Sequence, residues 1–304
     1  MLIVQSKSTD VYRNLAVEEW LLDHAPRLPV LFLCVNDPCV VIGKNQNPWR
    51  ECRLSLMEEE GVPLARRISG GGTVYHDRGN LNVSVIVART GYTEQKQYDL
   101  IFQALEATAL RHNSSILGKN SLGVDGLKFS GQAFCHRRDR SLHHGTILVN
   151  ADLSRLGRYL GPELAGIETK AIASIPAEVA NLTQFVPELT VEKVSDALMA
   201  QFKKMYAPHG GTRPATIDLG PVGRVPSPGE SEIPEEQLRS IIQKISSNDW
   251  KLRHTPKFTF RDLQIEGGRV VNREGAPSLE DFLKKGDFDG DDSSDHDTAQ
   301  FPGV

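Results

Sequence analysis

The chain has 304 residues, of which 39% are hydrophobic and 24% charged, and its formal net charge is −4. This balance is that of an ordinary globular protein, and without a basic excess we expect no nucleic-acid partner. No stretch approaches eighteen consecutive apolar residues, so we expect no transmembrane helix and no membrane partner. The four cysteines form neither a CxxC pair nor a zinc pattern, and we expect no metal site. The first residues do not have the pattern of a secretory signal, which favours a cytoplasmic protein.

The first part of the chain predicts alternating strands and helices. Strands are expected over 2–4, 30–35, 39–42 and 81–87, and helices over 14–25, 49–60 and 94–113. Apolar residues recur at helical spacing in the helices and are β-branched or continuous in the strands. Pro26 and Gly61 end the first two helices.

A glycine-rich segment precedes the strand at 81–87. Residues 66–80 read RRISGGGTVYHDRGN, with two arginines before three glycines and a polar cluster after them. Three consecutive glycines let the backbone approach a ligand closely, while the arginines can neutralise an anion. The spacing is neither that of a P-loop nor that of a Rossmann fingerprint. We therefore expect an anion-binding or nucleotide-binding loop.

Two further stretches predict neighbouring strands. Residues 125–134 read DGLKFSGQAF, a strand after a turn, on which we expect Lys128 and Ser130 to share one face. Residues 141–150 read SLHHGTILVN and predict the antiparallel partner strand. His143 and His144 would then face opposite sides, which disfavours a joint metal site.

The remaining sequence predicts mostly helices and a Pro/Gly-rich segment. Helices are expected over 153–160, 190–206, 234–246 and 279–284, and strands over 258–263 and 269–271 with a Gly-Gly turn between them. Residues 207–231 are rich in proline and glycine and predict an irregular segment. We expect a catalytic domain over 1–250, a small C-terminal region over 251–285 and an acidic, disordered tail over 286–304.

These motifs resemble the signatures of lipoate–protein ligases, within the biotin/lipoate A/B protein ligase superfamily. The resemblance rests on residues 66–80, 125–134 and 143–150, with weaker matches at 43–49, 169–175 and 250–258. It implies an α+β fold, in which a mixed β-sheet is flanked by helices, followed by a short C-terminal extension.

The resemblance also implies a two-step reaction with ATP, Mg²⁺ and lipoate. Lipoate first attacks the α-phosphate of ATP to give lipoyl-adenylate. An acceptor lysine then takes the lipoyl group, on a lipoyl domain of a 2-oxoacid dehydrogenase complex or on a protein like the glycine cleavage H protein. Such chemistry needs cations and backbone donors, for which Arg67 and Lys128 are the best candidates.

The family's functional positions carry over to this sequence as follows. Lys128 is the expected catalytic residue. ATP and lipoyl-adenylate are expected to contact Arg67, Ser69, Gly70, Gly71, Gly72, Thr73, Val74, Tyr75, His76, Asn80, Asn120 and Lys128. Lipoate is expected to contact Gly71, Lys128, Gly131, Ala133, His144 and Thr146.

One departure from the family leaves alternatives open. The family usually has Asn-Asp where this chain has Asn120-Ser121, so a carboxylate is missing. A transferase that takes preformed lipoyl-adenylate, or an octanoyl or lipoyl group from a carrier protein, is the main alternative. A cysteine-dependent transferase would need Cys135 as its nucleophile. A biotin ligase is disfavoured, because this sequence does not contain the arginine-glycine adenylate loop of that family. A non-catalytic binder of lipoyl domains is the alternative from a different class of function.

Overall fold

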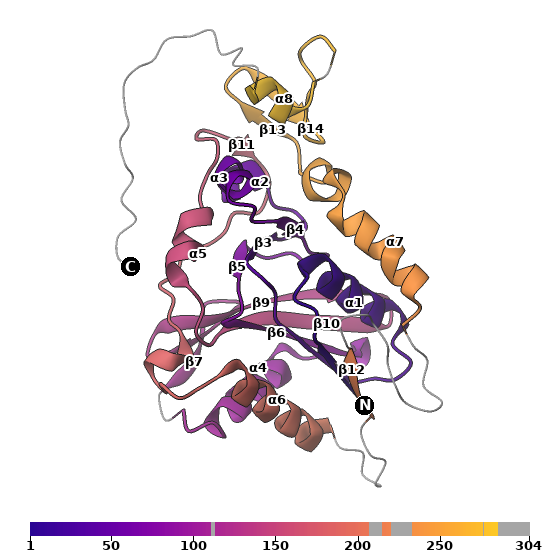
Figure 1. The fold of residues 1–304 in the computed structure, drawn as a ribbon, viewed down its shortest axis with the longest axis vertical. Coiled ribbons are helices and arrows are strands. Elements are labelled where there is room, and N and C mark those ends of the chain that lie inside the picture. Colours follow the sequence, from indigo (N-terminus) through magenta and orange to yellow (C-terminus); the bar gives the residue numbers. More distant parts are fainter. Residues whose placement is uncertain (111–112, 207–214, 220–232, 276, 285–304) are drawn as a thin grey trace.

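A large mixed β-sheet forms the centre of the molecule (Figure 1). The computed structural model describes residues 1–110, 113–206, 215–219, 233–275 and 277–284. The eight strands have the order β12-β1-β2-β6-β10-β9-β8-β7. They are β1 (Leu2–Ser6), β2 (Val30–Cys34), β6 (Asn80–Ala88), β7 (Ser114–Leu117), β8 (Ser121–Val124), β9 (Leu127–His136), β10 (Arg140–Leu148) and β12 (Ala215–Leu219). β1 is parallel to β12 and β2, whereas the other neighbours are antiparallel. The expected α+β fold with a mixed sheet is confirmed.

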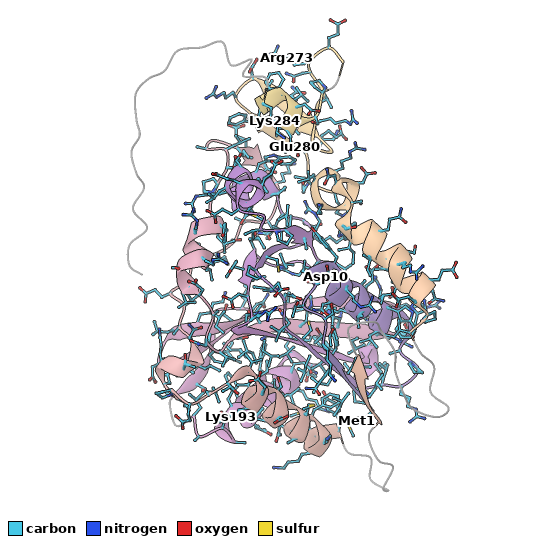
Figure 2. The ribbon with its side chains drawn as sticks, in the orientation of Figure 1. Met1, Asp10, Lys193, Arg273, Glu280 and Lys284 are labelled. Atoms are coloured by element: carbon cyan, nitrogen blue, oxygen red, sulfur yellow. The ribbon has the colours of Figure 1, made fainter. Side chains whose placement is uncertain are left out.

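Helices cover both faces of this sheet. α4 (Glu94–Glu106) and α6 (Val191–Tyr206) lie below it in Figure 1, and α1 (Val11–His24) and α7 (Glu235–Ser246) lie above. Two hydrophobic cores result, one for each face. Figure 2 shows side chains filling both layers, with Lys193 on the lower helical layer.

Local caps set the ends of the helices. The Asp10 side chain accepts from the Arg13 N–H, so α1 begins at Val11, three residues earlier than its apolar pattern predicts. α4 ends at Glu106 instead of residue 113, and Ala109 after it has a φ of +66°. A left-handed residue cannot continue a helix, which explains the shorter element.

A second, three-stranded sheet carries the glycine-rich segment. It consists of β3 (Cys39–Ile42) between β4 (Leu64–Arg66) and β5 (Val74–His76). The single helix expected over 49–60 is wrong: α2 (Pro48–Glu51) and α3 (Leu54–Glu59) are separate. Cys52 between them is extended and forms a bridge with Leu160, so the chain turns there.

The C-terminal region folds against α2 at one end of the molecule (Figure 1). Its sheet joins β11 (Glu168–Thr169), β13 (Phe258–Phe260), β14 (Leu263–Glu266) and β15 (Arg269–Val270), with α8 (Leu279–Lys284) beside it. The strand expected over 258–263 is instead part of a hairpin that turns at Arg261, which has a φ of +54°. The Gly267–Gly268 turn is confirmed.

Several shorter elements complete the chain. They are α5 (Leu153–Tyr159), the short helices Arg89–Gly91 and Leu182–Gln184, and a π-helix over Asp249–Arg253. β12 lies inside the segment expected to be irregular, so that expectation is wrong for 215–219. The rest of 207–231 and the tail over 286–304 lie outside the described residues. In the described part of the chain, no helix has the length and apolar character needed to cross a membrane.

Candidate active site

The glycine-rich loop, residues 67–73, links β4 to β5 and is held from inside by Arg67. The Arg67 guanidinium donates to the Gly70 carbonyl at 2.6 Å and to the Gly72 carbonyl at 2.7 Å. Among the residues that the structure describes, the N–H groups of Gly70, Gly71 and Gly72 find no protein acceptor. The loop therefore keeps its carbonyls inside and its N–H donors available, which is the arrangement of an anion-binding nest.

A β-bulge places Lys128 on the same face as this loop. Leu122 on β8 is opposite Ser130 and Gly123 is opposite Lys128, so Phe129 is the extra residue of β9. The expectation that Lys128 and Ser130 share a face is wrong, because a bulge interrupts the alternation of side chains. A Cβ on Gly131 would lie 3.4 Å from the Lys128 Nζ, whereas the Ser130 Oγ accepts from Gln132 on the opposite face.

The residues expected to contact lipoate gather beneath the loop. Ala133 on β9 pairs with His144 on β10, and the Gly131 N–H reaches the Thr146 Oγ1 at 3.4 Å. A Cβ on Gly71 would lie 3.4 Å from the Ala133 Cβ, so the loop touches this face of the sheet. The sheet and the loop thus bring the residues expected to contact lipoate together on one face.

Lys128 is a partly buried cation without a counter-charge. Burial lowers the pKa of its ammonium group, and it has no ion-pair partner in the described part of the chain. Its backbone is fixed by hydrogen bonds to the Glu178 carbonyl and from the Ala180 N–H, both at 2.9 Å. A desolvated ammonium group held in place in this way favours the binding of an anion.

A wall of the site comes from residues 44–47 and 171–180. The Thr73 Oγ1 donates to the Gln46 Oε1 at 3.0 Å, and the Thr73 N–H donates to the Ser174 Oγ at 2.9 Å. Gln46 is fully buried, and its Oε1 also accepts from the Gly43 N–H. The glycine loop is therefore linked to two segments that are far from it in the sequence.

Three of the residues expected to bind adenylate have contacts outside the loop. The Tyr75 ring packs against Tyr159 with centroids 5.8 Å apart, and Val74 contacts a separate apolar cluster. Asn120 contributes its carbonyl to the Gln132 N–H at 2.8 Å, at the end of β8. These contacts belong to the fold around the site, and the adenylate contacts of the three residues stay predictions.

His76 and Asn80 are buried and each retains an unused polar atom. The His76 Nδ1 contacts the Asn36 Nδ2 at 3.0 Å, but its Nε2 has no partner among the described residues. Burial lowers the pKa of His76 to about 3, with smaller effects from Arg67 and His144. The Asn80 Oδ1 is also without a partner in this part of the chain. Unpaired buried polar atoms cost free energy, so both mark places where a ligand or water can bind.

Glu18 and Ser84 are the site residues that the sequence motifs did not indicate. The Glu18 carboxylate accepts from the His144 Nδ1 at 2.7 Å and from the Ser84 Oγ at 2.5 Å. The signal available in the sequence was its spacing: Glu18 lies four positions after Asn14, so both side chains are on the inner face of α1. A carboxylate in a buried helix stripe requires a partner, which here comes from a distant strand.

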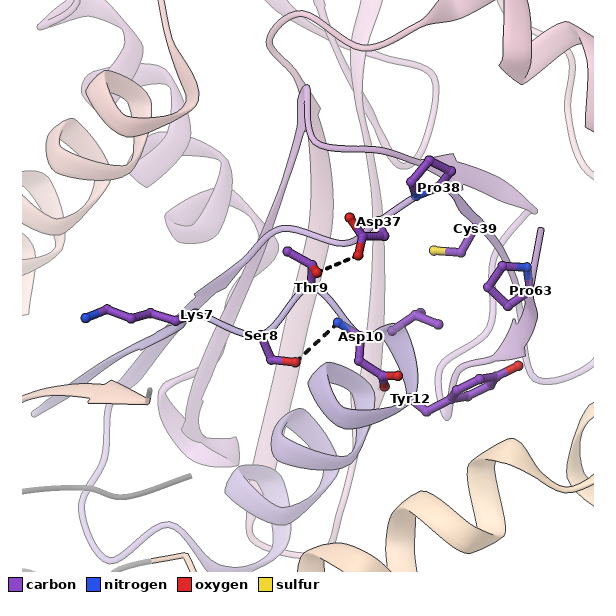
Figure 3. Close-up of a pocket in the computed structure, with 10 residues that line it drawn as sticks. Lys7, Ser8, Thr9, Asp10, Tyr12, Asp37, Pro38, Cys39 and Pro63 are labelled. Atoms are coloured by element: carbon purple, nitrogen blue, oxygen red, sulfur yellow. Dashed lines mark hydrogen bonds between the residues drawn. The ribbon is translucent and has the colours of Figure 1, made fainter. Parts of the chain in front are cut away.

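A separate pocket of about 370 Å³ lies at the start of α1 (Figure 3). Lys7, Ser8, Thr9 and Asp10 line it, and the Thr9 hydroxyl donates to Asp37 at 2.6 Å. No residue of the glycine loop lines it. Across the described ranges, no group of three or more His, Cys, Asp or Glu side chains is arranged to hold a metal ion.

The mixed sheet, with the glycine loop and the partly buried Lys128 on one of its faces, defines a catalytic domain of the lipoate protein ligase type. The family model described as the lipoyl protein ligase A/B catalytic domain matches residues 10–203. The chain therefore belongs to this family.

Known proteins of the family are similar to most of the chain. Lipoate-protein ligase A of Psychrobacter cryohalolentis is 37% identical over 261 residues, which cover 84% of this chain and 74% of that protein. The mitochondrial lipoyl amidotransferase LIPT1 of Homo sapiens is 38% identical over 261 residues, covering 85% and 67%. A crystal structure of lipoate-protein ligase A bound with ATP has a TM-score of 0.66 and 25% identity, covering 82% of this chain and 97% of that one.

Proposed function

We propose that the protein is an ATP-dependent lipoate–protein ligase that transfers lipoate to the lysine of a lipoyl-domain acceptor. The observation that carries this proposal is the desolvated Lys128 ammonium group. Within the described ranges it lacks a counter-charge, and it faces the same side of the sheet as the N–H donors of the glycine loop, which have no acceptor there. Both groups can bind an anion, and the substrate carboxylate and the ATP phosphates are anions. The family membership and the similarity to a ligase bound with ATP support it.

In the first step, an oxygen of the lipoate carboxylate forms a bond to the α-phosphorus of ATP, and the bond to pyrophosphate breaks. The glycine N–H groups donate to the phosphate, while Lys128 offsets the charge of the two anions as they approach. Arg67 acts on the loop, because its donors are already bonded to the carbonyls of Gly70 and Gly72.

In the second step, the acceptor amine forms a bond to the acyl carbon and AMP leaves. Lys128 stabilises the negative charge that develops on the acyl oxygen, and the amine releases its proton to solvent. The intermediate stays bound between the loop and the sheet. No protein nucleophile is needed.

We infer that the magnesium ion is held mainly by the phosphates of ATP. Asn120 and Ser121 offer neutral oxygens only, and the described residues hold no group of three or more His, Cys, Asp or Glu side chains arranged for a metal ion. Mg²⁺ prefers carboxylates together with substrate phosphates, so the ion would arrive with ATP.

Ser121 favours a second candidate, a lipoyl amidotransferase. It pairs with Gly131 beside Lys128, where a carboxylate would help the adenylation step. The human relative bears the name of an amidotransferase, which supports transfer from preformed lipoyl-adenylate or from a lipoylated protein. A cysteine-dependent transferase has less support, because burial raises the pKa of the Cys135 thiol above its usual value.

One assay distinguishes these candidates. The full chain is incubated with lipoate, ATP, Mg²⁺ and an apo lipoyl domain from a 2-oxoacid dehydrogenase complex or an apo glycine cleavage H protein, and the acceptor's mass is measured. A lipoyl gain that requires ATP is expected. A gain only with synthetic lipoyl-adenylate, or only with an octanoyl or lipoyl carrier protein, would establish the transferase. No gain with any donor would contradict both proposals. The cytoplasmic location stays a prediction from the sequence.

A further inference from the structure

A buried chain of hydrogen bonds lies beneath the glycine loop. The Arg67 Nε donates to the Ser69 Oγ at 3.0 Å, and the Ser69 Oγ lies 2.6 Å from the His144 Nε2. The His144 Nδ1 is 2.7 Å from the Glu18 Oε2, which also accepts from the Ser84 hydroxyl at 2.5 Å. All five side chains are buried. We refer to Arg67, Ser69, His144 and Glu18 as the relay.

The two ends of the relay have fixed hydrogen-bonding roles. A guanidinium can only donate and a carboxylate can only accept. The Ser69 Oγ therefore accepts from the Arg67 Nε, and the His144 Nδ1 carries a proton that it donates to Glu18. The relay thus joins a buried cation at one end to a buried anion at the other.

The two charged ends compensate one another inside the protein. Burial raises the pKa of Glu18, but the charge and hydrogen bond of His144, the Ser84 hydroxyl and the Arg67 charge outweigh it and lower the pKa overall. Burial also lowers the pKa of Arg67 to about 10, with Glu18 acting against that change. Loss of either charge would leave the other one buried and uncompensated.

The relay ends on the backbone of the glycine loop. Arg67 bonds the carbonyls of Gly70 and Gly72, and the Ser69 carbonyl accepts from the Lys44 N–H at 2.7 Å. The side chains at the other end, Glu18 and His144, are beneath the loop and belong to α1 and β10. The orientation of the N–H groups of the glycine loop therefore depends on Glu18 and His144, although neither side chain is bonded to a carbonyl of the loop.

We propose that Glu18 and His144 are positioning residues, which hold Ser69 and Arg67 so that the glycine loop presents its N–H groups to the phosphate of the adenylate. This proposal rests on the proposed function. It gives His144 a different role from the lipoate contact that the family resemblance implies, and it adds Glu18 to the site.

The neighbouring His143 provides a matched control. It is 2% exposed, and its Nε2 lies 2.9 Å from the Gln132 Oε1 while its Nδ1 lies 2.9 Å from the Tyr92 hydroxyl. It is on the same strand as His144 but faces away from the loop. His143→Gln therefore tests the loss of a buried, hydrogen-bonded histidine without touching the relay.

The test measures binding of a sulfamoyl analogue of lipoyl-adenylate to the full chain by calorimetry. Glu18→Gln and His144→Gln are expected to raise Kd at least tenfold, and to raise KM in the transfer assay more than they lower kcat. His143→Gln is expected to change Kd less than threefold. Wild-type affinity in both relay variants would overturn this proposal alone. A wild-type protein that neither binds the analogue nor transfers lipoate would contradict the proposed function, and the positioning role with it.

A second measurement applies even where a variant fails to fold. The wild-type protein is labelled with ¹⁵N-histidine, and the analogue is added during NMR. Coupling of the relay to the loop predicts that the ring nitrogen resonances of His144 shift and those of His143 do not. Unchanged His144 resonances at saturation would show a purely structural role and overturn the proposal.

Discussion

Lys128 shows how a functional residue can lower the stability of the fold. Its ammonium group is desolvated and, among the described residues, has no carboxylate partner. At a pH below the lowered pKa of the folded protein, the lysine is charged in both the folded and the unfolded chain. Folding must then desolvate that charge, which lowers stability. Between that pKa and the ordinary value of 10.5 the unfolded chain binds more protons, so stability rises with pH there.

Replacement of Lys128 by methionine should separate stability from activity. At pH 7.5 we expect Lys128→Met to raise the unfolding free energy by about 1 kcal/mol, because the uncompensated charge is removed. Acyl transfer should fall by roughly 100-fold or more, since the charge on both anions is no longer offset. Denaturant titration and the transfer assay measure the two effects. The exposed Lys193→Met is the control, and a Lys128→Met protein that still transfers lipoate would refute the site assignment.

Two buried histidines should make the protein sensitive to acid. Burial lowers the pKa of both His76 and His143 to about 3. From about pH 6.5 downward the unfolded chain takes up protons that the folded chain does not, so stability falls by up to about 1.4 kcal/mol per pH unit for each group.

The acid sensitivity can be assigned to one histidine by difference. Between pH 7.5 and 5.5, His143→Gln should lose about 1.4 kcal/mol less stability than the wild type, because one titrating group is gone. Urea unfolding at both pH values measures this difference. An identical pH dependence in the two proteins would show that the pKa of His143 is the same in the folded and the unfolded chain, and would contradict the prediction.

At the level of elements, the site depends on the close contact between the end of β3 and the glycine loop. A Cβ on Gly43 would lie 2.3 Å from the Gly71 carbonyl oxygen, and the Gly43 N–H donates to Gln46. Both partners are backbone or buried, so neither can move without displacing the loop. The loop is therefore positioned by β3 as well as by Arg67.

Gly43→Ala should damage binding more than folding. We expect the Kd of the adenylate analogue to rise at least tenfold, because the added methyl group pushes the loop away from β9. Gly157→Ala in α5 is the matched control: nothing lies within 4 Å of its Cβ position. That variant should gain about 0.5–1 kcal/mol in stability and keep its affinity. Unchanged affinity in Gly43→Ala would show that the loop is free to move.

The sequence predicted the elements whose cause is local and missed those whose cause is distant. Apolar spacing predicted α6 and β10 within two residues, because burial follows the period of each element. The bulge at Phe129 depends on pairing with β8, and the break at Cys52 depends on Leu160. Glu18 was missed for the same reason, since its partners lie on β6 and β10. The motifs indicated the loop and Lys128 as the candidate site, but not the residues that hold them in place.

At the scale of the whole molecule, the C-terminal region shares its core with the catalytic domain. Trp49 of α2 is 1% exposed and packs against Phe258 with ring centroids 5.5 Å apart. Arg66, next to the relay arginine, donates to the Lys251 carbonyl at 2.7 Å and to the Thr255 hydroxyl at 2.8 Å. The same guanidinium donates to the Gln46 carbonyl at 2.8 Å, so a wall of the active site and the C-terminal region share one donor.

This shared core predicts one cooperative unfolding transition for residues 1–285, instead of separate transitions for the catalytic domain and the C-terminal region. Trp49→Ala should cost about 3–5 kcal/mol and shift the whole transition to lower temperature, because the cavity opens between the two regions. Scanning calorimetry measures the transition, and Val271→Ala, at a side chain that is 49% exposed, is the control. Two transitions, of which Trp49→Ala moves only one, would show that the regions fold independently. A single shifted transition would show that the C-terminal region and the active site fold as one unit. Because truncation after residue 246 removes the partners of Arg66 and Trp49, the shorter chain should then lose the geometry of the active site as well.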